Sequence, residues 1–193
     1  MKQGQRKKKR KFLTRNEIDY LLHATKTGQH AARNYCLTLL CFIHGFRASE
    51  ICRLKISDID LEARCIYIYR LKKGFSTTHP LLDREIDALN DWLDNRNNYQ
   101  KSSSEWLFLS RKGNPLSRQQ FYKIISTSGV IAGIPLDIHP HMLRHSCGYA
   151  LADMGIDTRL IQDYLGHRNI RHTVWYTASN AGRFYGIWDK CPH

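Results

Sequence analysis

The fold is decided by residues 139–177, which read HPHMLRHSCGYALADMGIDTRLIQDYLGHRNIRHTVWYT. Apolar residues recur here at helical spacing, which predicts three consecutive helices over 140–154, 158–165 and 170–176. Pro140 suits the first turn of a helix, with His139 before it as the cap. Gly155 and Gly166 stand where the first two helices should end, because glycine readily adopts the backbone conformation of a helix C-terminus.

Upstream of this stretch, capping residues and apolar spacing predict further helices. They cover 15–27, 30–44, 48–55, 83–96 and 118–128. Residues 30–44 are apolar nearly all round, so that helix should be buried. Gly129 is expected to open a loop that reaches Asp137.

One segment has the pattern of a β-strand. Residues 64–70, RCIYIYR, alternate in polarity and contain β-branched and aromatic side chains. Lys73-Gly74 can form a turn, and residues 75–80 can return as the second strand of a hairpin. The expected fold class is mainly α with a small antiparallel β-hairpin.

The composition excludes several classes of protein. A chain of 193 residues that is 42% hydrophobic can form one core and one small extra lobe. No run of 18 uncharged apolar residues predicts a membrane span, and no apolar segment follows the basic N-terminus as in a secretory signal. The six cysteines never form CxxC, which favours reduced core thiols in a cytosolic protein over a zinc site.

The charge points to an anionic partner. Lys and Arg number 30 against 17 acids, and eight of these bases, with no acid, lie in residues 1–16. The rest of the chain therefore keeps 22 bases against 17 acids. A basic arm on a mildly basic domain is typical of nucleic-acid binding, although a tail that only aids solubility is the alternative.

His141 and Arg144 are the first candidate site residues. They are three apart on one predicted helix and lie in its first turns, where backbone N–H groups and the helix dipole favour an anion. An ordinary capping or surface pair is the competing interpretation. His145 points about 100° away by helical geometry, so we expect it in the core or behind the site.

Three more residues complete the candidate set: His167 after Gly166, Tyr176 nine residues later, and the distant Arg47. A tyrosine with a pKa of about 10 needs positive charge or a base to act as a nucleophile, and two arginines and two histidines supply that field. Trp175 and Tyr149 are interpreted as packing aromatics.

The chemistry of this set suits attack on a phosphodiester. Arginines can clamp the non-bridging oxygens, and a set so poor in Asp and Glu implies neither a metal nor another cofactor. Expulsion of the 5′ oxygen needs a proton donor, which a lysine at the hairpin tip, Lys72 or Lys73, can provide.

The order and spacing of these residues resemble the signature of the tyrosine recombinase (phage integrase) family. The matching elements are Arg47 in GFRASE, His141-x-x-Arg144, LGH at 165–167 and Tyr176. Each element is weak alone, but the ordered set is specific. The resemblance extends over residues 12–190 and is strongest to the small recombinases of fimbrial phase variation.

The resemblance implies a metal-independent enzyme that inverts a short promoter-bearing DNA segment through a 3′-phosphotyrosine on Tyr176. Arg47 and Arg144 would clamp the phosphate, His141 would act as general acid/base and His167 would bond the phosphate. The distance to His79 favours Lys72 over Lys73 as the proton donor. The implied partners are double-stranded DNA with inverted recombination sites, a homotetramer that exchanges C-terminal helices, and accessory DNA-bending proteins, in the bacterial cytoplasm at the nucleoid.

The chain departs from most of the family in one respect. We expect a basic flexible tail over 1–11 and a catalytic domain over 12–190, without the N-terminal core-binding domain. DNA affinity should therefore depend on the tail and on bending partners. Possible DNA contacts on one helix face, or alternatively a solvated face, are Arg118, Gln119, Gln120 and Lys123.

Two other functions fit the same residues. One is a DNA-binding regulator on this fold that does not cut DNA, and the other is a DNA-relaxing enzyme that resembles type IB topoisomerases. The presence of every signature residue disfavours the first, and the small size disfavours the second.

Overall fold

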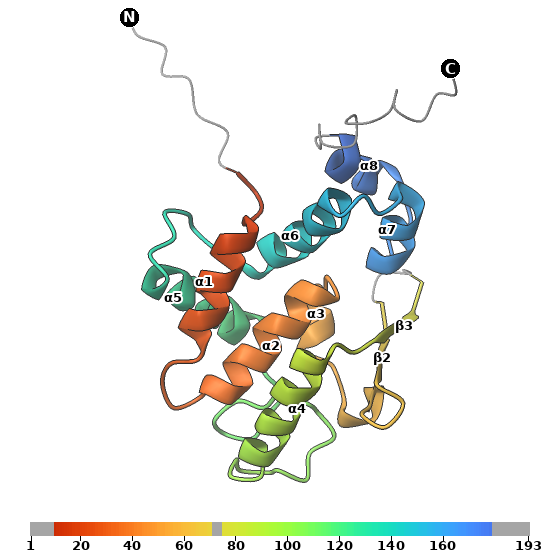
Figure 1. Ribbon diagram of the computed structural model, residues 1–193. Coiled ribbons are helices and arrows are strands. Elements are labelled where there is room, and N and C mark those ends of the chain that lie inside the picture. The colour runs from red at the N-terminus through yellow and green to blue at the C-terminus, as the bar shows by residue number, and fades with distance from the viewer. Residues whose placement is uncertain (1–9, 71–74, 179–193) are drawn as a thin grey trace, which may run out of the picture.

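The structure, a computed structural model, describes residues 10–70 and 75–178. The helices are α1 (Arg15–Thr25), α2 (Ala31–Ile43), α3 (Ala48–Ile51), the 3₁₀ helix η1 (Ile56–Asp58), α4 (Asp83–Arg96), α5 (Arg118–Ile131), α6 (Pro140–Asp153), α7 (Thr158–Leu165) and α8 (Arg171–Ala178). The strands are β1 (Ile59–Asp60), β2 (Cys65–Ile68) and β3 (Thr77–Pro80). The fold is mainly helical with one small sheet at its edge, as expected (Figure 1).

The sheet is antiparallel, with the strands in the order β1-β2-β3. Ile66 of β2 lies opposite both Ile59 of β1 and His79 of β3. The predicted hairpin is therefore confirmed, while its turn at Lys73-Gly74 falls outside the described residues. Strand β1 was not predicted, because two residues are too few to show a strand pattern.

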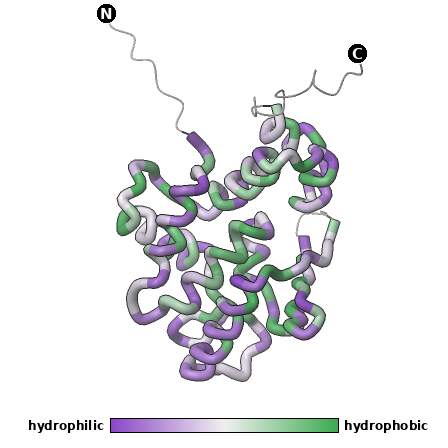
Figure 2. The backbone as a smooth tube through the Cα atoms, viewed as in Figure 1, coloured by the Kyte–Doolittle hydropathy of each residue, from purple (hydrophilic) through white to green (hydrophobic). Residues whose placement is uncertain are grey.

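Helix α2 lies at the centre of the main core, as its apolar sequence predicts. Its Leu37, Leu39 and Leu40 are fully buried, and it packs against α1, α4 and α6. The apolar colouring of this central helix is visible in Figure 2. Among the described residues, no helix is both long enough and apolar enough to span a bilayer.

A second, smaller core joins the last three helices. It consists of Cys147, Ala152, Ile161, Leu165 and Tyr176. These residues come from α6, α7 and α8, which lie together at one end of the molecule (Figure 1). The helical unit predicted from residues 139–177 is thus held by its own apolar cluster.

Most of the predicted helix boundaries are close to the observed ones, and two are wrong. Helix α3, expected over 48–55, already ends at Ile51. The capping box of Thr14 and Glu17 opens α1 as expected, with Glu17 N donating to Thr14 Oγ1 over 3.3 Å. Helix α5, in contrast, continues through Gly129 to Ile131. A side chain at Gly129 would lie 2.7 Å from Ile138, so this glycine permits close packing and does not stop the helix.

Candidate active site

Arg144 lies on the buried side of α6 and joins two distant turns of the chain. Its side chain is only 2% exposed. The guanidinium donates to the carbonyl oxygen of Gly45 and, over 2.7 Å, to that of Leu165. Burial, followed by the positive charges of Arg47 and Arg70, lowers the pKa of Arg144 to about 10. Several cations are therefore concentrated around the start of α6.

The buried carboxylate of Glu50 binds two other arginines of the site, Arg47 and Arg70. Arg47 stands at the N-cap of α3 and donates from Nη1 to Glu50 Oε1 over 2.6 Å and from its backbone N to Oε2 over 2.9 Å. Arg70 donates to the same Oε2 over 3.0 Å and to the carbonyl oxygens of His44 and Tyr164. Burial alone would raise the pKa of Glu50, but the hydrogen bonds from Arg47 and the charge of Arg70 lower it overall.

Glu50 and Arg70 were missed in the sequence, which predicted a site with hardly an acid. The signal for Glu50 was present, because Arg47-x-x-Glu50 has the spacing of a helix capping box. Arg70 carried no such signal, since it comes from the end of a strand and meets Glu50 only in the folded chain. Arg47, Arg70 and Arg144 outnumber Glu50, so the expected cationic character of the site is retained.

Tyr176 is buried in the small core, with 3% of its surface exposed. Its ring lies directly over Gly148, where an added Cβ would come within 2.5 Å of it, and packs against Tyr149 at 5.1 Å between centroids. Its hydroxyl lies 3.0 Å from Nδ1 of His145. Burial raises the pKa of Tyr176 to about 12, although Arg144 and Arg47 act in the opposite direction. The nucleophile is thus a neutral phenol within electrostatic reach of both arginines.

His167 follows Gly166, whose left-handed conformation (φ 64°) ends α7 as expected. The ring is largely buried, and Nδ1 lies 2.9 Å from the buried hydroxyl of Thr173. Burial, followed by the charge of Arg144, lowers the pKa of His167 to about 3, so the ring is neutral at physiological pH. The contact with Thr173 therefore fixes the orientation of the His167 ring, a role that the sequence position of Thr173 did not suggest.

The histidines of α6 form a short series of edge-to-face ring contacts that leads to the tyrosine. The rings of His141 and His145 are 4.5 Å apart, and His145 in turn contacts Tyr176. His145 is therefore closer to the nucleophile than helical geometry suggested. Tyr149 packs on Phe12 as expected, whereas Trp175 is 74% exposed, so its interpretation as a packing residue is wrong.

The structure brings together most of the predicted site. Arg144, His141, His167 and Tyr176 share one region, and Arg47 acts electrostatically on all four of them. Lys72 and Lys73 lie outside the described residues. A cationic cluster around a buried phenol is suited to bind a phosphodiester and to let the phenol attack it.

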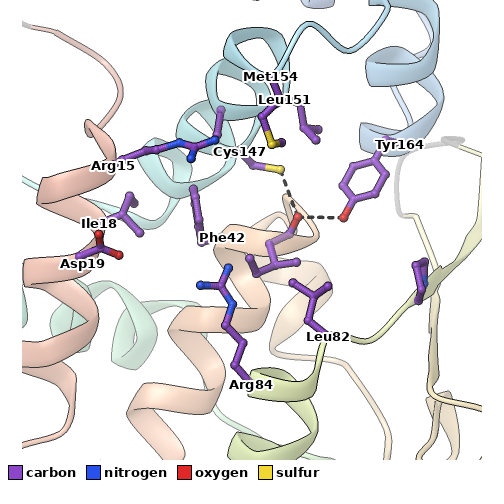
Figure 3. A pocket seen from close by; sticks show the side chains of 13 residues that line it. Arg15, Ile18, Asp19, Phe42, Leu82, Arg84, Cys147, Leu151, Met154 and Tyr164 are labelled. Atoms are coloured by element: carbon purple, nitrogen blue, oxygen red, sulfur yellow. Dashed lines mark hydrogen bonds between the residues drawn. The ribbon is translucent and has the colours of Figure 1, made fainter.

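An apolar groove opens next to this region, between α1, the end of α2, α6 and α7 (Figure 3). Its volume is about 490 Å³. At its floor, Cys147 Sγ and Tyr164 Oη both donate to the carbonyl oxygen of Ile43, over 3.3 and 3.0 Å. Its apolar lining includes Phe42, Leu82, Cys147, Leu151, Met154 and Tyr164.

Residues 11–183 match the phage integrase family, and the chain belongs to that family. It is 78% identical over 190 residues to the type 1 fimbriae regulatory protein FimB of Escherichia coli (strain K12), a match that covers 98% of this chain and 95% of the relative. Its fold is that of the tyrosine recombinases. XerA recombinase superposes with a TM-score of 0.80 at 27% identity, over 94% of this chain and 66% of that chain. The post-cleavage complex of XerH site-specific recombinase with palindromic difH superposes with a TM-score of 0.77 at 29% identity, over 93% of this chain and 53% of that one.

The chain is therefore a tyrosine site-specific recombinase, an enzyme that cleaves and rejoins DNA strands. The resemblance inferred from Arg47, His141-x-x-Arg144, His167 and Tyr176 is confirmed at the level of the family. The chain spans 66% or less of the two solved recombinases with which it was compared.

Proposed function

We propose that this recombinase inverts a short promoter-bearing DNA segment in fimbrial phase variation. The support is its identity to FimB over nearly the whole of both chains. The reaction passes through a 3′-phosphotyrosine on Tyr176 and needs no metal. The observation that carries the mechanism is the position of the Tyr176 hydroxyl, beside a neutral histidine and in the field of Arg144 and Arg47.

The remaining site residues act on the phosphate. Arg47 and Arg144 clamp its non-bridging oxygens, and the electrostatic effect of Arg47 on Arg144, which arises because the two cations lie near each other, supports this role. His167 bonds the phosphate, and His141, which is exposed at the first turn of α6, acts as general acid/base on it. Lys72, or Lys73 beside it, donates the proton to the leaving 5′ oxygen.

DNA is bound by the α5 face and by the basic tail. Arg118 and Gln119 on the first turn of α5 line a shallow depression together with His141, which places this helix face next to the site. Gln120 and Lys123 extend the same exposed face. Residues 1–11 add phosphate contacts to those of the catalytic domain, residues 12–190.

The active assembly is a homotetramer on two inverted recombination sites, in the bacterial cytoplasm at the nucleoid, with DNA-bending proteins as accessories. The apolar groove of Figure 3 supports a contact between copies, because it offers a surface for the C-terminal residues of a neighbour. The exposed Val174 and Trp175 on α8 add apolar surface at the same end of the chain.

A nicked DNA that carries the inverted repeats and releases the strand downstream of the cleavage site tests this function. Wild-type protein should form a covalent protein–DNA adduct, and Tyr176→Phe should form none while still binding the DNA. A non-cutting regulator would bind without an adduct in either case. Relaxation of a plasmid without paired sites would instead indicate an enzyme that resembles type IB topoisomerases.

A further inference from the structure

A ring nitrogen of His145 lies within hydrogen-bond distance of the Tyr176 hydroxyl. The distance from Oη to Nδ1 is 3.0 Å. Both groups are held in place: the tyrosine ring lies on Gly148, and His145 sits one residue after the buried Arg144 on α6. The contact therefore belongs to the packed small core.

The direction of this hydrogen bond follows from the surroundings of His145. The titratable groups that act on it are Lys11, His139, His141, Arg144 and Tyr176. Burial, followed by the positive charges among these groups, lowers the pKa of His145 to about 4, so the ring is neutral at pH 7. A neutral phenol next to a neutral imidazole donates its proton, which places the lone pair on Nδ1 and the hydrogen on Nε2.

His141 is less well placed for this proton. Its ring lies 4.5 Å from the ring of His145, on the side of the first turn of α6 and toward the depression shared with Arg118. His141 is exposed, where it can meet a phosphate oxygen, whereas His145 is half-buried against the nucleophile. The two histidines thus face different partners.

We propose that His145 is a catalytic residue that accepts the phenolic proton of Tyr176 as the tyrosine attacks the DNA phosphorus. The inference rests on the proposed function and assigns one of its proton transfers. Tyr176 Oη forms a bond to phosphorus, its proton moves to Nδ1 of His145, the bond from phosphorus to the 5′ oxygen breaks, and the hairpin lysine protonates that oxygen. Rejoining reverses every transfer.

The same geometry keeps the free enzyme inactive. Burial raises the pKa of Tyr176 and lowers that of His145, so proton transfer before attack is unfavourable. A phosphodiester bound to Arg47 and Arg144 compensates part of the positive charge that weakens His145 as a base. Proton transfer is then coupled to attack on a bound phosphate.

The test compares His145→Gln with wild type on the nicked DNA. Glutamine keeps an acceptor oxygen for the hydroxyl but is a far weaker base. The rate of adduct formation should fall by about 10²–10⁴-fold while DNA affinity and melting temperature stay near wild type. His23→Gln, an exposed histidine on α1, is the matched control and should retain the wild-type rate.

A DNA with sulfur in place of the 5′ bridging oxygen separates the two proton transfers. A thiolate leaves without protonation, since the pKa of a thiol is about 8.5. This DNA should restore the rate of Lys72→Ala, or of Lys73→Ala, but not that of His145→Gln. Added imidazole should restore His145→Ala, with a pH dependence that follows free imidazole, which a purely structural residue would not show.

Each outcome decides between specific claims. A wild-type rate for His145→Gln, or full recovery of that variant with the sulfur DNA, overturns the assignment of His145. A slow His145→Ala that imidazole leaves unchanged assigns the residue to packing and also overturns it. Absence of an adduct with wild-type protein contradicts the proposed function itself, so the two failures are distinguishable.

Discussion

Arg144 and Gly45 are joined by a hydrogen bond from the guanidinium to the backbone carbonyl, although they are 99 residues apart in the chain. Arg70 directs Nη1 at the same carbonyl oxygen. The turn after α2 is therefore the point at which the cationic cluster is attached to the main core. The position of Arg47, two residues after Gly45, depends on that turn.

This relationship makes Gly45 sensitive to substitution. Its φ is +58°, and an added Cβ would lie 2.3 Å from Leu165 and 3.3 Å from Cys147. We expect Gly45→Ala to lower the free energy of unfolding by about 2–4 kcal/mol, because it adds steric overlap to backbone strain. Gly28→Ala, at φ +82° with no atom within 4 Å, should show only the strain, about 1–2 kcal/mol. Urea denaturation of the two variants measures the difference; equal losses would show that the contact with Leu165 relaxes.

Glu50→Gln tests the buried carboxylate between Arg47 and Arg70. Removing one partner of a buried ion pair should cost about 3–5 kcal/mol and slow adduct formation, since Arg47 loses its support. The folded pKa of Glu50 is lowered, so its stabilisation is complete above the unfolded pKa of about 4.3 and is lost as the pH falls through the folded value. The difference in unfolding free energy between wild type and Glu50→Gln should therefore shrink on acidification. The exposed Glu62→Gln should behave like wild type throughout.

Arg144→Lys distinguishes the contribution of the positive charge at this position from that of the two guanidinium donors. Lysine retains a positive charge but cannot donate from two nitrogens to the carbonyls of Gly45 and Leu165. We expect DNA binding to persist and adduct formation to fall by about 10²–10³-fold. Arg144→Ala should in addition destabilise the fold by roughly 1–3 kcal/mol, because the Leu165 carbonyl loses this partner and the Gly45 carbonyl keeps only the longer bond from Arg70. Filter binding, adduct assays and thermal melts, run in parallel, check the three effects; collapse of DNA binding in Arg144→Lys would show that the residue is mainly structural.

Acid should weaken the fold before its carboxylates titrate. The pKa of His79 is lowered to about 3 by burial and by the charge of His44, and that of His167 is similarly low. Because these folded pKa values lie below the unfolded value of about 6.5, stability is complete above pH 6.5 and is lost as the pH falls toward 3. Each such histidine contributes a loss of about 2 kcal/mol between pH 6.5 and 5. Melting curves at those two pH values should show a smaller loss for His79→Gln than for wild type, and an unchanged loss for His23→Gln.

Deletion of residues 1–11 tests the basic tail. Seven of its eleven residues are Lys or Arg, so the deletion should weaken DNA affinity and flatten its salt dependence. Each phosphate contact that is lost should reduce the slope of log affinity against log salt by about 0.9. Equilibrium binding at several salt concentrations measures the slope; unchanged affinity at moderate salt would contradict a role for the tail.

The sequence was sufficient for the parts of this molecule that local patterns control. Helices α4 and α7 begin and end where apolar spacing and caps predict, because their boundaries depend on neighbouring residues. The prediction that Gly129 opens a loop was wrong because the role of this glycine depends on its packing against Ile138, which only the folded chain brings close. The family motif located Arg47, Arg144, His167 and Tyr176, but motif spacing carries no information about cross-chain contacts. Three contacts could therefore be found only in the structure: those of Arg70 with Glu50, of Thr173 with His167 and of His145 with Tyr176.

The burial of Tyr176 has a consequence for how this enzyme can evolve. The residue that must reach the DNA also fills the small core with Cys147, Ile161 and Leu165. Substitutions that tighten this cluster would make the domain more stable to heat but would restrict the approach of Tyr176, together with its partner His145, to a bound phosphate. Selection for a high recombination rate should therefore keep the packing between α6, α7 and α8 loose. Variants selected for higher thermal stability should recombine DNA more slowly.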